Sequence, residues 1–280
     1  MDAPRLDRIG TLWVVGCGNM GSALLTRWIA CGVDPEHVVV IDPGAKDVPA
    51  GIRVVATAAE AGRAPDIVLL AIKPQLLAEV APTLTAHFDN PLILSILAGA
   101  RLATLGSLSL RVIRAMPNTP ARIGEGTTVL CGGVPEDRGF AEALMATAGA
   151  VHWIDDESLF DAVTGVSGSG PAYVFRFIEA LAAAATAAGL PAETAQALAL
   201  ETVTGAAALA ALRESSPAEL RKQVTSPNGT TAAGLAVLDG DGSLTALLAE
   251  TVAAAAARSA ELASAASPAI PGSSAGPAAG

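Results

Sequence analysis

Residues 11–21 read T-L-W-V-V-G-C-G-N-M-G, an apolar run that passes directly into three closely spaced glycines. An apolar, helix-forming stretch follows over residues 22–30. In this order of strand, turn and helix, the first glycine permits the tight turn, the second lets the backbone approach a pyrophosphate, and the third lets the helix pack on the strand. The anion then lies at the helix N-terminus, where unpaired N–H groups and the helix dipole favour it. The stretch therefore predicts an α/β domain that binds a dinucleotide.

Asp42 is the acidic residue that such a glycine loop requires about 20 residues further on. It follows the apolar run Val38–Ile41, so we expect it at the end of the second strand. A carboxylate there accepts hydrogen bonds from the adenosine ribose hydroxyls and repels a 2′-phosphate, which favours NADH over NADPH. The alternative is an ordinary turn residue ahead of Pro43 and Gly44.

The rest of the chain divides into two kinds of pattern. Short β-branched runs alternate with helical stretches as far as residue 154, which predicts strands over residues 12–15, 38–41, 53–55, 67–71, 92–96, 112–114, 128–131 and 151–154. Only Ala- and Leu-rich stretches follow, with predicted helices over residues 171–188, 192–212, 217–224, 230–238 and 243–263. We therefore expect an α/β fold in which a Rossmann-type, mostly parallel sheet domain (residues 1–157) precedes an all-α domain (158–264). Residues 265–280, rich in Ala, Ser, Pro and Gly, are predicted to be a disordered tail.

The composition excludes several classes of protein. The chain has 17 basic and 27 acidic residues and no basic stretch, which argues against a nucleic-acid partner. Its apolar stretches are shorter than the ~20 residues of a membrane span, and its start is unlike a signal peptide, so we expect a cytoplasmic protein. The three cysteines lack C-x-x-C spacing, which indicates reduced thiols and no metal site.

Several of the predicted helices are apolar on more than one face. In a chain without a membrane span, this pattern indicates burial against another subunit, and it predicts that the all-α domain is a dimerisation domain. The alternative is a genome that favours alanine, which is also the best helix former.

Two further loops are predicted at the carboxyl ends of strands, the edge where open α/β sheets bind ligands. They are A-I-K-P-Q over residues 71–75 and R-A-M-P-N-T-P over residues 114–120. Pro74 and Pro117 fix the backbone, so that the loops hold carbonyl groups and side chains rigidly, as a nicotinamide requires. Without the glycine motif, both loops would be interpreted simply as helix starts.

The helical half contains two loops rich in small and hydroxyl residues, each just before a helix. They are G-V-S-G-S-G-P-A-Y over residues 165–173 and V-T-S-P-N-G-T-T-A-A-G over residues 224–234. Two such helix N-termini together can bind a small carboxylate through backbone N–H groups without an arginine. Capping of the helices alone is the alternative. The predicted substrate is a small anion.

The residues absent from these loops narrow the chemistry. The three histidines, His37, His87 and His152, all lie outside the loops, and the lysines are Lys46, Lys73 and Lys222. No lysine lies in the glycine-rich helix where a hydroxyacid dehydrogenase places its proton donor, which disfavours carbonyl reduction. A C=N substrate arrives already protonated as an iminium, so the enzyme needs mainly to position two molecules.

Taken together, the five motifs resemble those of pyrroline-5-carboxylate reductases, in the order and spacing of that family, over residues 12–262. The resemblance implies reduction of 1-pyrroline-5-carboxylate to proline by NAD(P)H, a helical domain that interlocks with a second subunit, and dimers that commonly assemble into rings such as decamers. It implies a dinucleotide site built by Val15, Gly16, Cys17, Gly18, Asn19, Met20, Gly21, Asp42, Ala71, Ile72, Lys73, Pro74 and Asn118. It implies a substrate pocket formed by Ser169, Gly170, Gly229, Thr230 and Thr231, with loops from both subunits. Thr231 is the expected catalytic residue, whose hydroxyl bonds the ring nitrogen, and Glu214 lies either beside the pocket or at a solvated helix end.

Three positions depart from the family pattern. Residues 42–44 (D-P-G) stand where NADPH-using members often carry a Ser/Asn–Arg pair, which again favours NADH. Residues 57–58 (T-A) stand where many members have an asparagine that contacts the adenosine side. Asn228 replaces the first glycine of the usual S-P-G-G-T-T, and because asparagine tolerates positive φ we expect the loop shape to survive.

Three other functions stay open on the sequence alone. One is a hydroxyacid dehydrogenase, and the missing lysine argues against it. Another is a dinucleotide sensor without turnover, which leaves the two anion loops without a purpose. The third is a reductase of a six-membered ring imine, because pocket size decides ring selectivity.

Overall fold

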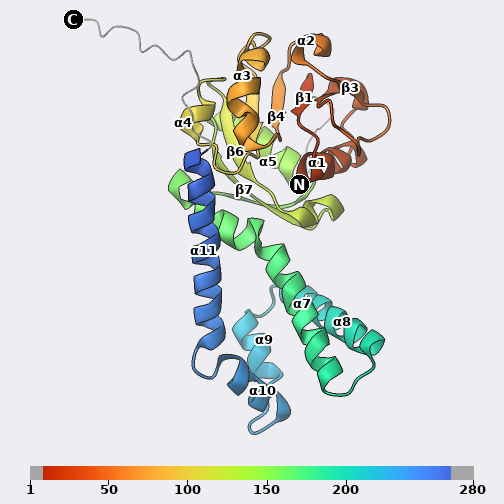
Figure 1. Ribbon diagram of the computed structural model, residues 1–280, viewed down its shortest axis with the longest axis vertical. Helices are drawn as coiled ribbons and strands as arrows, with labels where there is room; N and C mark the ends of the chain where they lie inside the picture. The colour runs from red at the N-terminus through yellow and green to blue at the C-terminus, as the bar shows by residue number, and fades with distance from the viewer. Residues whose placement is uncertain (1–8, 266–280) are drawn as a thin grey trace, which may run out of the picture. The chain divides into compact units, whose positions relative to one another are not determined.

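The computed structural model describes residues 9–265 of the chain (Figure 1). The described residues form two units. The first comprises residues 9–169 together with 254–265, and the second comprises residues 170–253.

The first unit is built on an eight-stranded sheet with the strand order β3-β2-β1-β4-β5-β6-β7-β8. All neighbouring strands are parallel except β6 and β7, which are antiparallel. The strands are β1 (Leu12–Val15), β2 (Val38–Ile41), β3 (Arg53–Val55), β4 (Ile67–Leu70), β5 (Leu92–Ser95), β6 (Val112–Met116), β7 (Gly126–Gly132) and β8 (Gly149–Trp153). The chain order reverses between β1 and β4, so the connections from these two strands lead to opposite sides. Ligands of doubly wound sheets bind at this point, outside the carboxyl ends of the strands.

Helices cover both faces of the sheet. They are α1 (Asn19–Ala30), α2 (Ala58–Ala61), α3 (Leu77–Thr85), α4 (Leu102–Leu105), α5 (Pro135–Ala146) and α6 (Phe160–Val163), and a π-helical turn, η6 (Thr164–Gly168), continues α6. Side chains alternate across a strand, so Leu12 and Val14 of β1 join the core that contains Trp28 of α1, whereas Trp13 and Val15 join the core that contains Leu84 of α3. Burial on both faces explains why the central strands are continuous apolar runs.

The second unit is helical. It contains α7 (Gly170–Ala187), α8 (Ala192–Ala211), α9 (Pro217–Gln223), α10 (Thr230–Asp239) and the first half of α11 (Ser243–Ala265). Helices α7 and α8 lie side by side as a hairpin (Figure 1), and their buried residues Ala182, Ala195 and Ala199 are small enough to let the two backbones approach closely. The last part of α11 belongs to the first unit, where Ser259 donates a 2.7 Å hydrogen bond to the carboxylate of Asp161.

The second unit exposes many large apolar side chains, most of them on its helices. These are Val174, Phe175, Phe177, Leu190, Leu198, Leu200, Leu209, Leu212, Val224, Val237, Leu238, Leu247 and Leu248. So many exposed large apolar side chains in one unit are a common mark of a protein interface.

The predicted fold class is confirmed: a mostly parallel sheet with helices is followed by a helical region. The strand ends were less accurate. β6 extends to Met116 beyond the predicted end at residue 114, because its pairing with β7 continues there. β7 and β8 begin at Gly126 and Gly149, two residues earlier than predicted, because their pairing includes glycines that carry no apolar signal. The predicted tail lies outside the described residues except for Ala265, which ends α11.

Within residues 9–265, no single helix is long and apolar enough to cross a membrane. One pair, α10 with α11, passes the same test of length and composition when taken together, with a bend of 44° between the two helices.

Candidate active site

The glycine loop connects β1 to α1, and each of its glycines has a separate steric reason. Gly16 has φ of +87°, and a Cβ there would lie 2.8 Å from the backbone of Ala71 in the loop after β4. A Cβ on Gly21 would lie 2.9 Å from the carbonyl oxygen of Gly16. At Gly18 a Cβ would meet nothing within 4 Å, so the loop faces open space where the backbone is free to approach a ligand. This space and the adjoining N-terminus of α1 fit a pyrophosphate.

Asp42 lies against this loop. One carboxylate oxygen accepts a 2.8 Å hydrogen bond from the backbone N–H of Cys17, and the other accepts a 2.8 Å bond from the N–H of Gly44. Asp42 therefore stabilises the turn that holds it and also places a negative charge beside the glycine loop. Each carboxylate oxygen has a further lone pair, so these bonds leave capacity for a ribose hydroxyl.

A cavity of about 540 Å³ lies at this edge of the sheet. Among the residues predicted to bind the dinucleotide, those that line it are Val15, Gly16, Gly18, Asp42, Ala71, Ile72 and Lys73. The side chains or backbones of Cys17, Asn19, Met20, Gly21, Pro74 and Asn118 are not part of its lining. The cavity is mainly apolar where α2 and α3 border it, as the base of a nucleotide requires.

Sequence reasoning missed most of the apolar wall. It consists of Ile41, Pro43, Ala56, Ala58, Leu76, Val80 and Leu84, together with the polar residues Glu79 and Thr83. These residues come from segments on either side of the glycine loop, and no motif connects them. The one available signal was the period of α3, which places Val80, Thr83 and Leu84 on a single helix face.

Asn118 follows β6, at the same edge of the sheet, and is 8% exposed. Its side-chain oxygen accepts a 2.8 Å hydrogen bond from the N–H of Thr127, and its side-chain nitrogen donates a 3.1 Å bond to the carbonyl oxygen of Ser167. Both ends of the amide are thus engaged with the protein's own backbone.

The first predicted anion loop lies at the end of the first unit. Ser169 follows the π-helical turn η6, and its N–H donates a 2.9 Å hydrogen bond to the carbonyl oxygen of Thr164. Gly170 begins α7 in the second unit. π-Turns are rare and are often found at functional sites.

The second predicted anion loop lies within the second unit, at the start of α10. Asn228 has φ of +59°, which confirms that asparagine adopts the left-handed conformation at this position. A Cβ on Gly229 would collide with the hydroxyl of Ser226, so glycine is required there. Thr230 and Thr231 form the exposed first turn of α10. Helix N-terminal N–H groups at this turn are available to an anion.

Glu214 lies between α8 and α9 in the second unit and is exposed. Among the described residues, Glu214 forms no hydrogen bond or ion pair with another residue predicted for the substrate pocket.

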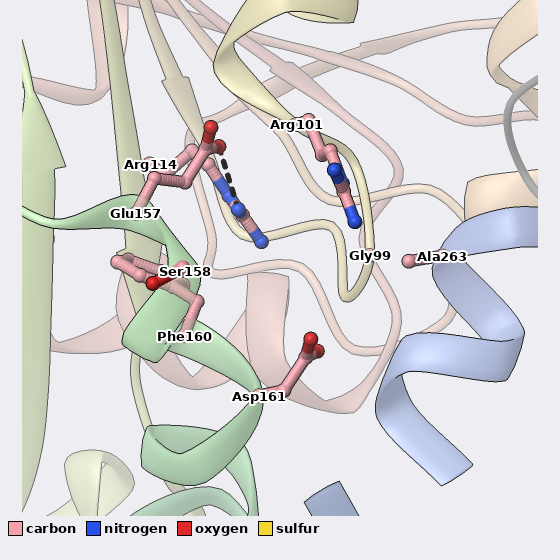
Figure 2. Close-up of a pocket in the computed structure, with 8 residues that line it drawn as sticks. All are labelled: Gly99, Arg101, Arg114, Glu157, Ser158, Phe160, Asp161 and Ala263. Carbon is pink, nitrogen blue, oxygen red and sulfur yellow. Dashed lines mark hydrogen bonds and ion pairs between the residues drawn. The ribbon is translucent and has the colours of Figure 1, made fainter. Parts of the chain in front are cut away.

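A second cavity, of about 430 Å³, lies within the first unit and was not predicted from the sequence. Figure 2 shows the guanidinium groups of Arg101 and Arg114 and the carboxylate of Asp161 directed toward the same space. Arg114 pairs with Glu157 at 2.7 Å and lies 4.2 Å from the centre of the Phe160 ring. Arg114 and Glu157 are far apart in the sequence, so no local sequence pattern predicts that they form an ion pair.

The arrangement supplies positioning and charge rather than a reactive centre. Among the described residues no group of three or more His, Cys, Asp or Glu side chains is placed to hold a metal ion. The cavity at the glycine loop has the size and polarity of a dinucleotide site, and redox chemistry that takes place on a bound dinucleotide needs mainly orientation from the protein.

Comparison with known families gives two matches, one to the first part of the sheet and one to a stretch that contains the whole second unit. A profile described as pyrroline-5-carboxylate reductase dimerisation matches residues 157–262. Another, described as NADP oxidoreductase coenzyme F420-dependent, matches residues 11–99. The first match accounts for the exposed apolar helices of the second unit and supports a homodimer.

Relatives that match over most of the chain belong to the same family as the dimerisation profile. The pyrroline-5-carboxylate reductase of Synechocystis sp. is 44% identical over 262 residues, which cover 90% of this chain and 97% of the relative. The Arabidopsis thaliana enzyme is 40% identical over 260 residues, covering 89% and 94%. Among solved structures, a pyrroline-5-carboxylate reductase from Coxiella burnetii superposes with a TM-score of 0.83 at 32% identity, covering 91% of this chain and 99% of that one. The Plasmodium falciparum pyrroline carboxylate reductase with NADP bound gives a TM-score of 0.80 at 28% identity, covering 90% and 98%. The chain therefore belongs to the pyrroline-5-carboxylate reductase family, the NAD(P)-dependent oxidoreductases of proline biosynthesis.

Proposed function

We propose a residue-level mechanism in which this chain orients the imine and holds its two polar groups. The glycine loop and the loop at residues 71–74 hold the dinucleotide, which supplies a hydride from C4 of its nicotinamide. The hydroxyl of Ser169 in the first loop and the backbone N–H groups at Thr230 in the second hold the substrate carboxylate, and the hydroxyl of Thr231 bonds the ring nitrogen. C5 of the ring receives the hydride while the nitrogen of the iminium keeps its proton, so that C=N becomes C–N.

The observation that carries the cofactor part of this proposal is the open space at Gly18, beside the cavity that Asp42 lines. The P. falciparum relative has NADP bound, which supports dinucleotide binding by this chain. The test is loss of nicotinamide absorbance when the purified enzyme is mixed with pyrroline-5-carboxylate and NADH or NADPH. A six-membered ring imine and a keto acid serve as competing substrates, and faster turnover of either one would contradict the assignment of the five-membered ring.

Thr231 is proposed as the catalytic residue because its hydroxyl is exposed on the first turn of α10, where a ligand has access to it. Thr231→Val keeps the shape of the side chain and removes the hydroxyl. We expect kcat/KM to fall roughly 10- to 100-fold, because a hydrogen bond to a charged group such as the iminium nitrogen contributes about 1.5–3 kcal/mol. Thr231→Ser is the matched control and should retain most of the activity. Full turnover by Thr231→Val would show that the nitrogen has another partner.

The second residue-level proposal is that Asp42 makes the enzyme prefer NADH. Its carboxylate lies against the glycine loop, where it repels a ribose 2′-phosphate. Asp42→Asn keeps the size and one acceptor oxygen but removes the charge. We expect the ratio of kcat/KM for NADPH to that for NADH to rise about tenfold, which corresponds to about 1.4 kcal/mol.

Asp42→Ser tests the second role of Asp42, stabilisation of the turn, because this variant loses the hydrogen bond to the N–H of Cys17 as well as the charge. A loss of activity with both cofactors in Asp42→Ser, together with an unchanged ratio in Asp42→Asn, would mean that Asp42 serves the turn alone.

We further propose that dimers assemble into a larger ring such as a decamer and that the enzyme works in the cytoplasm. Family resemblance supports the ring, and the free state of Cys17, Cys31 and Cys131 supports a reducing compartment. We also propose the domain limits 1–157 and 158–264, which the span of the dimerisation profile, residues 157–262, supports, although the two structural units divide after residues 169 and 253.

A further inference from the structure

The side chain of Asn118 joins three segments of the first unit. It follows β6, whose carboxyl end lies at the same edge of the sheet as those of β1 and β4 because these strands are parallel members of one sheet. Its two hydrogen bonds reach Thr127, in β7, and Ser167, in the π-turn η6. The residue is almost completely buried, so these bonds form away from competing water.

The amide has only one orientation that satisfies both partners. The backbone N–H of Thr127 is a donor and must face the oxygen, whereas the carbonyl of Ser167 is an acceptor and must face the nitrogen. A carboxylate of the same shape satisfies the first contact but places an oxygen against an oxygen in the second.

The carbonyl of Ser167 needs this donor for a reason visible in the sequence. In a continuing α-helix it would accept a bond from the N–H four residues later. That residue is Pro171, which has no N–H. The nitrogen of Asn118 supplies the bond that the proline removes, two residues before Ser169.

We propose that Asn118 is a positioning residue for the imine substrate: it fixes the π-turn so that Ser169 keeps its place relative to the edge of the sheet. In this proposal Asn118 acts through Ser167 and Ser169 rather than on the dinucleotide, whose proposed cavity it does not line. This inference rests on the proposed role of the Ser169 loop in holding the substrate carboxylate.

The test variant is Asn118→Asp, which removes one donor and keeps the side-chain shape. We expect kcat/KM for pyrroline-5-carboxylate to fall at least about tenfold, whereas the dissociation constant of NAD(P)H, measured by nicotinamide fluorescence without the imine, changes less than about twofold. The control is Asn90→Asp, before β5 at the opposite edge of the sheet, where the side-chain oxygen accepts bonds from Ser109 and Leu110 and an aspartate preserves both. This variant should keep wild-type kinetics.

A pH profile supplies a readout that loss of folding alone would not give. Protonation of the introduced carboxyl in the Asn118→Asp enzyme restores a donor toward Ser167, and burial raises the pKa of such a carboxyl. The ratio of variant to wild-type kcat/KM should therefore rise as the pH falls from about 8 to about 6, at a temperature where both proteins stay folded.

Coupling to Ser169 is measured by a double-mutant cycle. If Asn118 acts through the Ser169 loop, the effect of Asn118→Asp is smaller in a Ser169→Ala background than in the wild type. Additive effects, unchanged imine kinetics, or weaker dinucleotide binding with normal imine kinetics would each overturn the proposal. Wild-type kinetics in Ser169→Ala alone would instead contradict the proposed role of the Ser169 hydroxyl, a result that is separate from the response to Asn118→Asp.

Discussion

Cys17 lies in the middle of the glycine loop with a buried side chain. Burial raises the pKa of its thiol from 9.0 to about 11, and the negative charges of Asp42 and Asp47 contribute to the rise. A protonated thiol is a poor nucleophile, so Cys17 is a packing residue despite its place in the cofactor loop. Cys31, by contrast, is exposed at the end of α1.

We expect iodoacetamide at neutral pH to label Cys31 and leave Cys17 unmodified. Peptide mass spectrometry after a short exposure checks this order. Labelling of Cys17 at the same rate as Cys31 would show that the loop opens readily.

The raised pKa of Cys17 also predicts how stability depends on pH. Above pH 9 the unfolded chain loses this proton while the folded protein retains it, so the folded state binds more protons and the free energy of unfolding falls as pH rises from 9 to about 11. Below pH 9 the contribution is fully present. Urea unfolding at several pH values should show a smaller loss across this window in Cys17→Ala than in wild type.

At the residue scale, the spacing of the three glycines in the sequence was enough to predict the steric role of each one. Gly16, Gly18 and Gly21 carry three different steric requirements in the order that the motif predicts. The partners of Asn118 were not predictable, because Thr127 and Ser167 are brought to it by the pairing of β6 with β7 and by the π-turn. Hydrogen-bond partners of this kind depend on tertiary structure, and no periodic pattern in the sequence indicates them.

At the scale of elements, the turn after β5 is held against the last part of α11. Gly99 has φ of +80°, and a Cβ there would lie 2.6 Å from the Cα of Ala263. Ser259, one turn earlier on the same helix, donates to Asp161 at the start of α6. These contacts make the end of α11 a structural part of the first unit.

Gly99→Ala should therefore destabilise the protein through both backbone strain and the collision with α11. The left-handed conformation alone costs about 1–2 kcal/mol for a residue with a Cβ. Gly139→Ala is the matched control: Gly139 lies in α5 of the same unit, and a Cβ there meets nothing within 4 Å. Because alanine favours helix, the control should gain up to about 1 kcal/mol. Thermal unfolding of the two variants should shift in opposite directions.

Periodicity predicted the long helices and the first three strands well. The helices from α7 to α11 were predicted to within two residues at either end, and β1 to β3 were correct at both ends. The membership of α11 in the first unit was not predicted, because it depends on the approach of Ala263 to Gly99 across most of the chain. The antiparallel pairing of β7 with β6 was likewise not predicted, because the apolar pattern of a strand does not indicate its direction.

At the scale of the whole molecule, the second unit has too little core to account for its apolar composition. Few of its side chains are buried, whereas residues such as Phe175 (59% exposed) and Leu209 (52% exposed) face outward. The dimerisation match over residues 157–262 identifies the missing cover as a second copy of the chain.

Phe175→Glu should weaken the dimer, because burying a carboxylate in an apolar interface without a partner is unfavourable. Light scattering coupled to size-exclusion chromatography should give a lower molar mass for this variant than for the wild type. Leu110→Glu is the control, at an apolar residue of the first unit that is 86% exposed. Equal masses for wild type and Phe175→Glu would place the interface on another helix face.

The division of the first unit into two separate stretches of chain also bears on its synthesis. A ribosome completes β8 and η6 long before it makes the end of α11, and the 96 residues from 169 to 265 take about 5–20 s at typical rates of elongation. During that interval Asp161 lacks the hydroxyl of Ser259, and the turn at Gly99 lacks its covering helix. The first unit is therefore the first to be synthesised in large part, and it is also the last to receive all of its residues.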